Sequence, residues 1–349
     1  MDKVNLSAGV QGNTMTKYIR TLPETHWLTR LRRAILHGDL PWKWIIIAAA
    51  LLVMILILAV GEMLWRESVD ARTTFGFGFL TPTKDPSWDP VNDEFQAWPF
   101  IYGTLLTSIA ALILALPISI GIAIFMAELC PAWLRLPLNW LVELLAAIPS
   151  VVYGLWGVFV FLPLVVTPIA TGLFDVFGSV PVIGSLFTGP VPVSGASRLG
   201  AAFILTIMII PTITAVTRDV LLAIPNSQRE ASLALGSTQW ETIWKVLLPY
   251  GLSGILGAVI LGLGRALGET MAVTMVIGNS IEGSASLLRP GYTMASIIAN
   301  EFAEAVTKLH SESLIEIGLV LFFMTLILNM IARLLVWNVA RRTPQEARI

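Results

Sequence analysis

Charge is scarce in this sequence. Of its 349 residues only 13% are charged, while 56% are hydrophobic. Ordinary soluble domains carry about 25% charged residues, so the composition excludes a soluble globular protein and predicts an all-α, polytopic membrane protein. The formal net charge of −1 gives no basis for a nucleic-acid partner.

Residues for site chemistry are also few. Cys130 is the sole cysteine, which excludes an internal disulfide, and His26, His37 and His310 lie far apart, without metal-ligand spacing. The sequence has no G-x-x-x-x-G-K-[ST] phosphate loop. We therefore expect no catalytic residue, no metal and no cofactor in this chain. ATP hydrolysis of the P-loop kind is therefore not expected in this chain.

Long apolar runs are abundant. A membrane-spanning helix needs about 20 apolar residues. Six segments meet this length, and the third is the least regular, because Pro149 and Pro163 interrupt it. The predicted spans are Trp44 to Leu64, Ile101 to Ala127, Leu138 to Val166, Leu199 to Thr217, Tyr250 to Gly278 and Ser313 to Val336.

Basic residues set the orientation. The predicted N-terminal tail, the loop with Arg135, the loop with Arg229 and the C-terminal end hold 15 Lys and Arg residues, against 6 in the other loops. Because cytoplasmic loops carry the excess of positive charge, both termini are predicted to be cytoplasmic. The predicted organisation is a cytoplasmic tail (1–43), a transmembrane domain (44–340) and a second cytoplasmic tail (341–349).

The N-terminal tail is too long and polar for a cleaved secretory signal, so we expect it to stay in the cytoplasm. Between His26 and Leu36 its apolar residues recur at helical spacing opposite three arginines. Two interpretations stay open, an amphipathic helix on the membrane surface and a disordered basic tail.

The first external loop, residues 65–100, is acidic and contains Trp88 and Trp98. Aromatic side chains of this kind can anchor a partner, so the loop is a candidate landing surface for an external binding protein. The alternative is an interfacial aromatic belt, which we favour for Trp98 because it adjoins a span.

A polar stretch from Ser227 to Pro249 interrupts the apolar segments on the predicted cytoplasmic side. Ser227 with Glu230, and Thr238 with Glu241, have the spacing of helix capping boxes. Gly236 lies between them and can take the left-handed conformation that ends a helix. The stretch is predicted to form two short helices around a sharp turn, and Pro249 then ends the second or begins the next.

Arg265 lies near the middle of the fifth predicted span. A charge at the centre of a spanning helix is unfavourable by about 2.5 to 3.5 kcal/mol, so it should face protein or water and have a partner. Glu269, four residues on, is predicted on the same helix face. Two interpretations stay open. Arg265 could attract an oxyanion along a path, with Glu269 preventing the anion from binding too tightly, or the two residues could form a buried ion pair that fixes the packing between subunits.

Two further carboxylates lie near the predicted cytoplasmic edge. Glu143 falls within the third span, about six residues from its end, and is a candidate for a gate region. Glu128 lies at the membrane edge and is expected to be solvated.

The polar stretch also resembles a known motif. Glu230 and Ala231, then Gly236, then Leu248 and Pro249 have the spacing of the EAA loop of bacterial ABC-importer permeases, with Ser232 and Val246 as departures. The resemblance implies that loop 218–249 couples the permease to a cytoplasmic ATPase. The plainer alternative is an ordinary helical hairpin.

The resemblance extends over about residues 95–335. The segments 143–157, 262–279 and 300–304 are similar to the PstC family of phosphate ABC-importer permeases, although the long basic tail departs from it. The family implies the type I permease fold in the bacterial inner membrane, and an intramembrane Arg and Glu that match Arg265 and Glu269. It implies four kinds of partner: a PstA-like permease, a PstB-like ATPase dimer, an external PstS-like phosphate-binding protein and membrane lipid.

Other functions are weighed against a phosphate importer. A permease for sulfate, molybdate or another oxyanion would have the same architecture. An ion-coupled secondary transporter would need inverted repeats and mid-depth carboxylates, which the sequence does not display clearly. A membrane partner of a phosphate-sensing kinase would rest on the N-terminal tail alone.

Overall fold

The computed structural model describes residues 39–82, 87–181, 183–281 and 284–342. The chain divides into two compact units, Met1–Glu62 and Met63–Ile349. The amphipathic helix considered for residues 26–36 lies outside the described residues. The first unit contains most of α2 (Asp39–Glu67), whose apolar residues cover all its faces.

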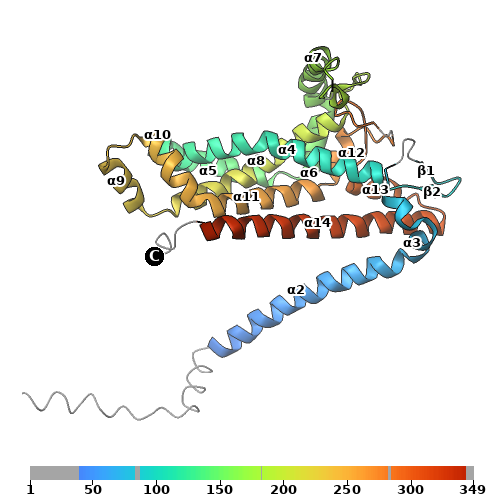
Figure 1. Ribbon diagram of the computed structural model, residues 1–349, viewed down its shortest axis with the longest axis horizontal. Helices are drawn as coiled ribbons and strands as arrows, with labels where there is room; N and C mark the ends of the chain where they lie inside the picture. Colours follow the sequence, from blue (N-terminus) through green and yellow to red (C-terminus); the bar gives the residue numbers. More distant parts are fainter. Residues whose placement is uncertain (1–38, 83–86, 182, 282–283, 343–349) are drawn as a thin grey trace, which may run out of the picture. The chain divides into compact units, whose positions relative to one another are not determined.

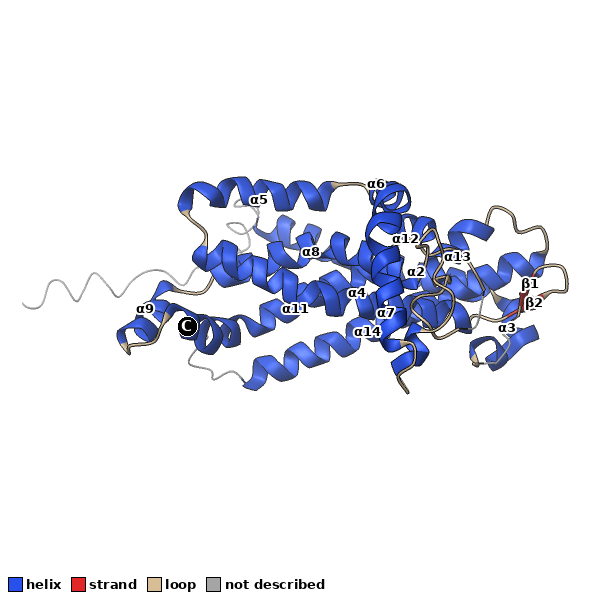
Figure 2. Cartoon of the chain, turned by 90° about the horizontal axis from the view of Figure 1, so that it is seen from above, coloured by secondary structure: helices blue, strands red, loops and turns tan. Residues whose placement is uncertain are grey.

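The second unit is almost entirely helical (Figures 1 and 2). Its elements follow in chain order: α3 (Val69–Phe75), η1 (Gly76–Leu80), β1 (Trp88–Asp89), β2 (Glu94–Phe95), α4 (Trp98–Ile124), η2 (Phe125–Leu129), α5 (Ala132–Ala147), α6 (Ser150–Trp156), η3 (Gly157–Val166), α7 (Thr167–Phe177), η4 (Ile183–Phe187), α8 (Arg198–Leu222), α9 (Asn226–Ala234), α10 (Gln239–Thr242), η5 (Ile243–Leu247), α11 (Leu248–Gly268), α12 (Met271–Val276), α13 (Met294–Glu301) and α14 (Lys308–Arg342).

The prediction of six membrane spans is confirmed in number. The described residues contain six helical segments that are long and apolar enough to cross a bilayer: Trp42–Glu67, Trp98–Leu129, Ser150–Phe177, Arg198–Leu222, Gln239–Gly268 and Lys308–Asn338. The chain is thus an all-α, multi-pass membrane protein. Several segments contain π-helical turns (η2, η3 and η5), and η3 contains Pro163, which cannot donate a helical hydrogen bond.

The third predicted span is wrong in its bounds. Residues 138–147 belong to α5, and the helix stops at Ile148, whose backbone is extended. Pro149 disfavours a helical conformation in the residue before it, and this explains the break. The spanning helix starts at Ser150 and continues through Pro163 to Phe177. The sequence pattern correctly marked this segment as interrupted but placed the span too early.

α8 is the central helix of the second unit. Ile204, Leu205, Met208, Ile209 and Ile213 are each at most 2% exposed. They pack against residues of α4, η3, α11 and α12 in one hydrophobic cluster. Figure 2 shows α8 between α5 on one side and α4 and α11 on the other. This burial follows from composition, because a helix that is apolar all round needs protein or lipid on every side.

Two ends of this unit can be distinguished in Figure 1. α9 and α10 lie at the same end as the last turns of α14, and α3, the β1–β2 hairpin and α13 lie at the opposite end. The hairpin pairs Trp88 with Phe95 in antiparallel register. Beside it the ammonium of Lys308 lies 2.6 Å from the Asp70 carboxylate, and this hydrogen bond holds the pKa of Asp70 below its ordinary value.

Trp88 is buried rather than presented to a partner. It is 6% exposed, and its indole Nε1 donates to Glu301 Oε2 at 2.6 Å. His310 Nε2 lies 3.1 Å from the same oxygen, and the His310 ring stacks on Phe95. Trp88 therefore anchors the hairpin to α13 and α14. The prediction that Trp88 helps to dock an external binding protein is therefore wrong, because its indole is buried and hydrogen-bonded inside this chain.

α4 makes a very close contact with the segment before α13. A Cβ atom added to Gly103 would lie 2.0 Å from the Tyr292 carbonyl oxygen. The contact is between backbones, so no side chain can move aside to relieve it.

We predict that Gly103→Ala destabilises the protein by about 1 to 3 kcal/mol or more, because the methyl group overpacks a backbone contact. Gly121→Ala is the matched control on the same helix, since its Cβ would meet nothing within 4 Å, and we expect it to change stability by at most about 1 kcal/mol. Thermal unfolding of the two purified variants tests this. Equal unfolding temperatures would contradict the close contact.

Candidate functional site

The fifth span ends earlier than the sequence pattern predicts. α11 stops at Gly268, Glu269 has an extended backbone with φ −70° and ψ 125°, and a short helix, α12, starts at Met271. The hydroxyl of Thr270 donates to the Gly268 carbonyl at 3.3 Å, which takes up one acceptor that the broken helix leaves unpaired. The prediction of one helix from Tyr250 to Gly278 is therefore wrong beyond Gly268.

Arg265 lies in the last turn of α11, next to this break. It is half-buried, and its Nη1 donates to Thr212 Oγ1 of α8 at 2.9 Å. Thr212 lies just past the midpoint of α8, a helix of 25 residues. Because α8 is long and apolar enough to span a bilayer, Arg265 lies beside the middle of a candidate spanning helix. Its depth in the membrane stays a prediction.

Glu269 does not share a helix face with Arg265. The chain leaves the helix before Glu269, and its carboxylate Oε1 accepts a long hydrogen bond, 3.4 Å, from the backbone N–H of Ala272. Among the described ion pairs none joins Arg265 to Glu269. The prediction that Arg265 and Glu269 share a helix face is therefore wrong, because it assumed an unbroken helix. Both residues still flank the same break.

The helices that follow the two interruptions, α6 and α12, pack against each other. α6 begins after the break at Ile148 and Pro149. A Cβ on Gly154 of α6 would lie 2.6 Å from Met275 Sδ and 3.2 Å from Ala272 Cα. The hydroxyl of Tyr153 donates to the Leu145 carbonyl at 2.8 Å across the first break. Other protein groups therefore pack against the backbone where the helices are interrupted, as a membrane environment requires.

Glu143 lies on α5, outside the third spanning helix. Its side chain is exposed, and no described hydrogen bond or ion pair involves it. The prediction placed it inside a span, and that placement is wrong because α5 is a separate helix. Its role in a gate region stays a prediction.

Loop 218–249 forms the predicted helix, turn and helix. Gly236 has φ +86°, the left-handed conformation expected of it. Thr238 and Glu241 form the predicted capping box. The second helix is longer than expected, since α10 continues through η5 into α11, and Pro249 lies within this helical run near the start of α11.

The first predicted capping box does not form. α9 follows Pro225 as its N-cap, without a side-chain cap, so the interpretation of Ser227 and Glu230 as a box is wrong. Glu230 and Ala231 are instead exposed on α9. Ser232, which stands where the EAA motif has alanine, is 8% exposed and lies 2.9 Å from Thr242 between their hydroxyl oxygens. This hydrogen bond holds the two helices of the loop together.

An ion pair connects this loop to η2, the π-helical turn that continues α4. Arg229 of α9 donates through Nε and Nη2 to the Glu128 carboxylate, with a shortest distance of 2.7 Å, and both side chains are less than 20% exposed. Arg229 also donates to the carbonyls of Leu221 and Ile224. The expectation that Glu128 is solvated is therefore wrong. No local pattern pointed to this pair, because its residues lie 101 positions apart.

Apolar side chains gather on the outer surface of the same loop. Leu233, Leu235, Trp240 and Trp244 are between 45% and 89% exposed. Exposed aromatic and aliphatic residues at the end of a membrane bundle are typical of a docking surface for another protein. Within the described residues no group of three or more His, Cys, Asp or Glu could hold a metal ion.

Comparison with known proteins identifies the class. The family described as "Binding-protein-dependent transport system inner membrane component" matches residues 119–344. The "Phosphate transport system permease protein PstC" of Pasteurella multocida is 48% identical over 293 residues, which cover 84% of this chain and 90% of that protein. The protein of the same description from Mesorhizobium japonicum is 46% identical over 296 residues, covering 85% and 89%.

Solved structures agree in fold. The chain resembles a chain of a bacterial alginate ABC transporter in complex with an alginate pentasaccharide-bound periplasmic protein, with TM-score 0.56, 16% identity, and coverage of 84% of this chain and 94% of that one. A chain of the MetNI methionine ABC transporter in an inward-facing conformation gives TM-score 0.50 at 16% identity, covering 72% and 99%. At these identities the likeness concerns the fold alone.

The interrupted helices and these matches define an inner-membrane permease subunit of the binding-protein-dependent transport class. The chain belongs to the PstC family within that class.

We predict that Glu128→Gln loosens α9, because it removes the charged acceptor of a largely buried arginine, and that local opening becomes easier by about 1 to 3 kcal/mol. Hydrogen exchange of the Asn226–Ala234 amides in the purified protein measures this. Lys245→Gln is the control, since it breaks the exposed pair with Glu241, which is worth at most about 0.5 kcal/mol. Equal exchange in both variants would argue against a stabilising role for the Glu128 pair.

Proposed function

We propose that this chain is the transmembrane permease subunit of an ATP-driven importer of inorganic phosphate and forms half of the translocation path. The observation that carries the proposal is the 44 to 48% identity to proteins named phosphate transport system permease protein PstC, over about 85% of the chain. The identity of the cargo as phosphate is inferred from these relatives. No covalent chemistry belongs to this chain, and ATP is hydrolysed on another.

Arg265 is the proposed phosphate-attracting group of the path, with Glu269 beside it. A guanidinium has five N–H donors in a fork that fits oxyanions. One described hydrogen bond, to Thr212, engages this group, so donors are left for a passing anion. No described ion pair joins Arg265 to Glu269. This favours an anion path over the alternative, a buried ion pair between the two residues that fixes subunit packing.

Loop 218–249 is the proposed coupling element. Glu230, Ala231 and Gly236 lie on α9 or in the turn after it, and Leu248 and Pro249 begin the next helix. The exposed apolar residues of the loop offer a surface for a PstB-like ATPase dimer. Because Arg229 joins α9 to Glu128 of η2, at the end of the span Trp98–Leu129, movement of the docked loop on ATP binding would reach a spanning helix directly.

The proposed assembly has a PstA-like second permease in the membrane and a PstS-like phosphate-binding protein outside. The excess of Lys and Arg supports a cytoplasmic position for both termini and for loop 218–249. The described ends of the second unit are compatible with this, since α9, α10 and the end of α14 lie together (Figure 1). The organisation of tail (1–43), transmembrane domain (44–340) and tail (341–349) is part of this proposal.

Uptake of radiolabelled phosphate tests the function. Permease-deficient cells would express this chain with its partners and either an intact or a hydrolysis-dead ATPase. We expect uptake to disappear with the dead ATPase and to be unaffected by excess sulfate. Uptake that persists with the hydrolysis-dead ATPase would support a secondary transporter instead. Competition by sulfate or molybdate would indicate that the permease transports another oxyanion with the same architecture.

Replacement of Arg265 tests the path. We expect Arg265→Ala to lower phosphate uptake at least about 10-fold, since a charge-assisted hydrogen bond is worth about 1.5 to 3 kcal/mol, and the complex to assemble normally. Arg333→Ala removes the same charge from an exposed position of α14 and is expected to keep uptake. Normal uptake in Arg265→Ala would contradict the path, and loss of co-purifying partners would favour a packing role.

A further inference from the structure

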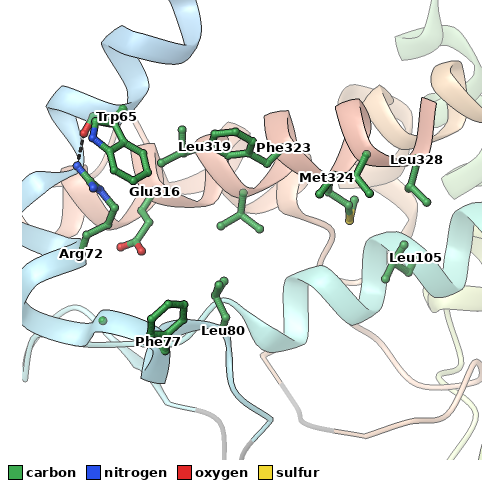
Figure 3. Close-up of a pocket in the computed structure, with 13 residues that line it drawn as sticks. Trp65, Arg72, Phe77, Leu80, Leu105, Glu316, Leu319, Phe323, Met324 and Leu328 are labelled. Carbon is green, nitrogen blue, oxygen red and sulfur yellow. Dashed lines mark hydrogen bonds between the residues drawn. The ribbon is translucent and has the colours of Figure 1, made fainter. Parts of the chain in front are cut away.

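A cavity of about 640 Å³ lies between α14, α4 and the segment around α3 and η1, away from Arg265 (Figure 3). Most of its wall is apolar, with Leu105 of α4 on one side and Leu319, Phe323, Met324 and Leu328 along α14. Figure 3 shows these α14 side chains as a row that leads away from Arg72 and Glu316. The cavity therefore has a long apolar part and one polar end.

Glu316 forms part of the polar end. It is 5% exposed, and its Oε2 is buried without a described hydrogen-bond partner. A buried carboxylate oxygen without a partner is strongly unfavourable, by about 1 to 3 kcal/mol for a polar group and more for a charged one. This orphaned acceptor indicates that a donor from another molecule belongs beside it.

Arg72 supplies the opposite charge at the same end. Its guanidinium lies 3.8 Å from the centre of the Trp65 ring, Nε donates to Ser68 Oγ at 3.2 Å, and Nη2 donates to the Trp65 carbonyl. These bonds hold the arginine in place and leave other N–H groups without a described partner. Among the described ion pairs none joins Arg72 to Glu316. The polar end of the cavity thus contains a positively charged arginine and a carboxylate that are not paired with each other in the described structure.

The size of the cavity selects the kind of occupant. Pockets for small molecules have volumes of about 300 to 1,000 Å³, and 640 Å³ falls in this range. A cavity of this volume with a long apolar wall is large enough for an extended hydrocarbon chain.

The depth of the polar end fits a lipid headgroup. α14 has 35 residues and is about 52 Å long, whereas a bilayer with its headgroups is about 40 to 45 Å thick. Glu316 lies eight residues, or about 12 Å, from the start of α14. When α14 is centred in the bilayer, Glu316 lies roughly 7 Å below the membrane surface, where headgroups meet acyl chains.

We propose that this cavity binds a phosphatidylethanolamine molecule. Its phosphate lies at Arg72, its ammonium donates to the orphaned Glu316 carboxylate, and one acyl chain follows the apolar row along α14. The zwitterionic headgroup matches the two separated charges, whereas an anionic phosphatidylglycerol offers Glu316 only neutral hydroxyl donors in place of the ammonium. The site is independent of which anion the permease transports.

Native mass spectrometry of the purified transporter complex tests the proposal. The complex would be delipidated and titrated with phosphatidylethanolamine or phosphatidylglycerol. We expect the unmodified protein to prefer phosphatidylethanolamine, and Glu316→Gln to weaken its binding at least about 10-fold with little change for phosphatidylglycerol. Equal binding of both lipids, or no effect of Glu316→Gln, would overturn the headgroup assignment.

A matched pair of variants keeps the test decisive if Glu316→Gln fails to fold. Leu328→Trp fills the apolar end, and Leu326→Trp adds the same bulk two residues away, where the side chain is 44% exposed and does not line the cavity. We expect only Leu328→Trp to reduce phosphatidylethanolamine binding. Equal binding by the two variants would contradict the proposal. So would efficient cross-linking of Leu328→Cys, in a Cys130→Ser background, to the second permease, because a partner helix would then cover the cavity.

Discussion

Backbone polar groups cannot be left unpaired in hydrocarbon, and the architecture of this protein follows from that constraint. A continuous helix meets it within its own hydrogen bonds, so the central helix α8 crosses the unit unbroken. Where the backbone leaves the helix, protein must replace the lost partners. The break at Ile148 and Pro149 is covered by the Tyr153 hydroxyl, and the break at Glu269 is backed by Thr270 and α12.

The break at Glu269 also explains the surroundings of the intramembrane arginine. A helix that continued past Gly268 would keep Arg265 on a surface of packed side chains. Because the helix stops there, the guanidinium lies next to an irregular segment. Its hydrogen bond to Thr212 has a separate cause, the packing of α11 against α8.

The sequence predicted the large elements well and the irregular ones poorly. The number of spans was predictable because each needs only a run of apolar residues, and Gly236 and Thr238 were predictable because turn and cap chemistry is local. The helix end at Gly268 was missed, because apolar residues resume at Met271 and the segment was interpreted as one span, although glycine commonly ends a helix. The ion pair of Glu128 with Arg229 was unpredictable for a different reason, because only the tertiary fold brings residues so distant in sequence together.

The glycine contacts divide the molecule into stiff and compliant joints. Where Gly103 meets the Tyr292 carbonyl, backbone presses on backbone, so α4 and the segment before α13 must move as one piece. Gly154 meets the Met275 thioether, which is an adaptable side chain, as well as the Ala272 backbone. A small movement of α6 against α12 is therefore easier to accommodate than one between α4 and the segment before α13.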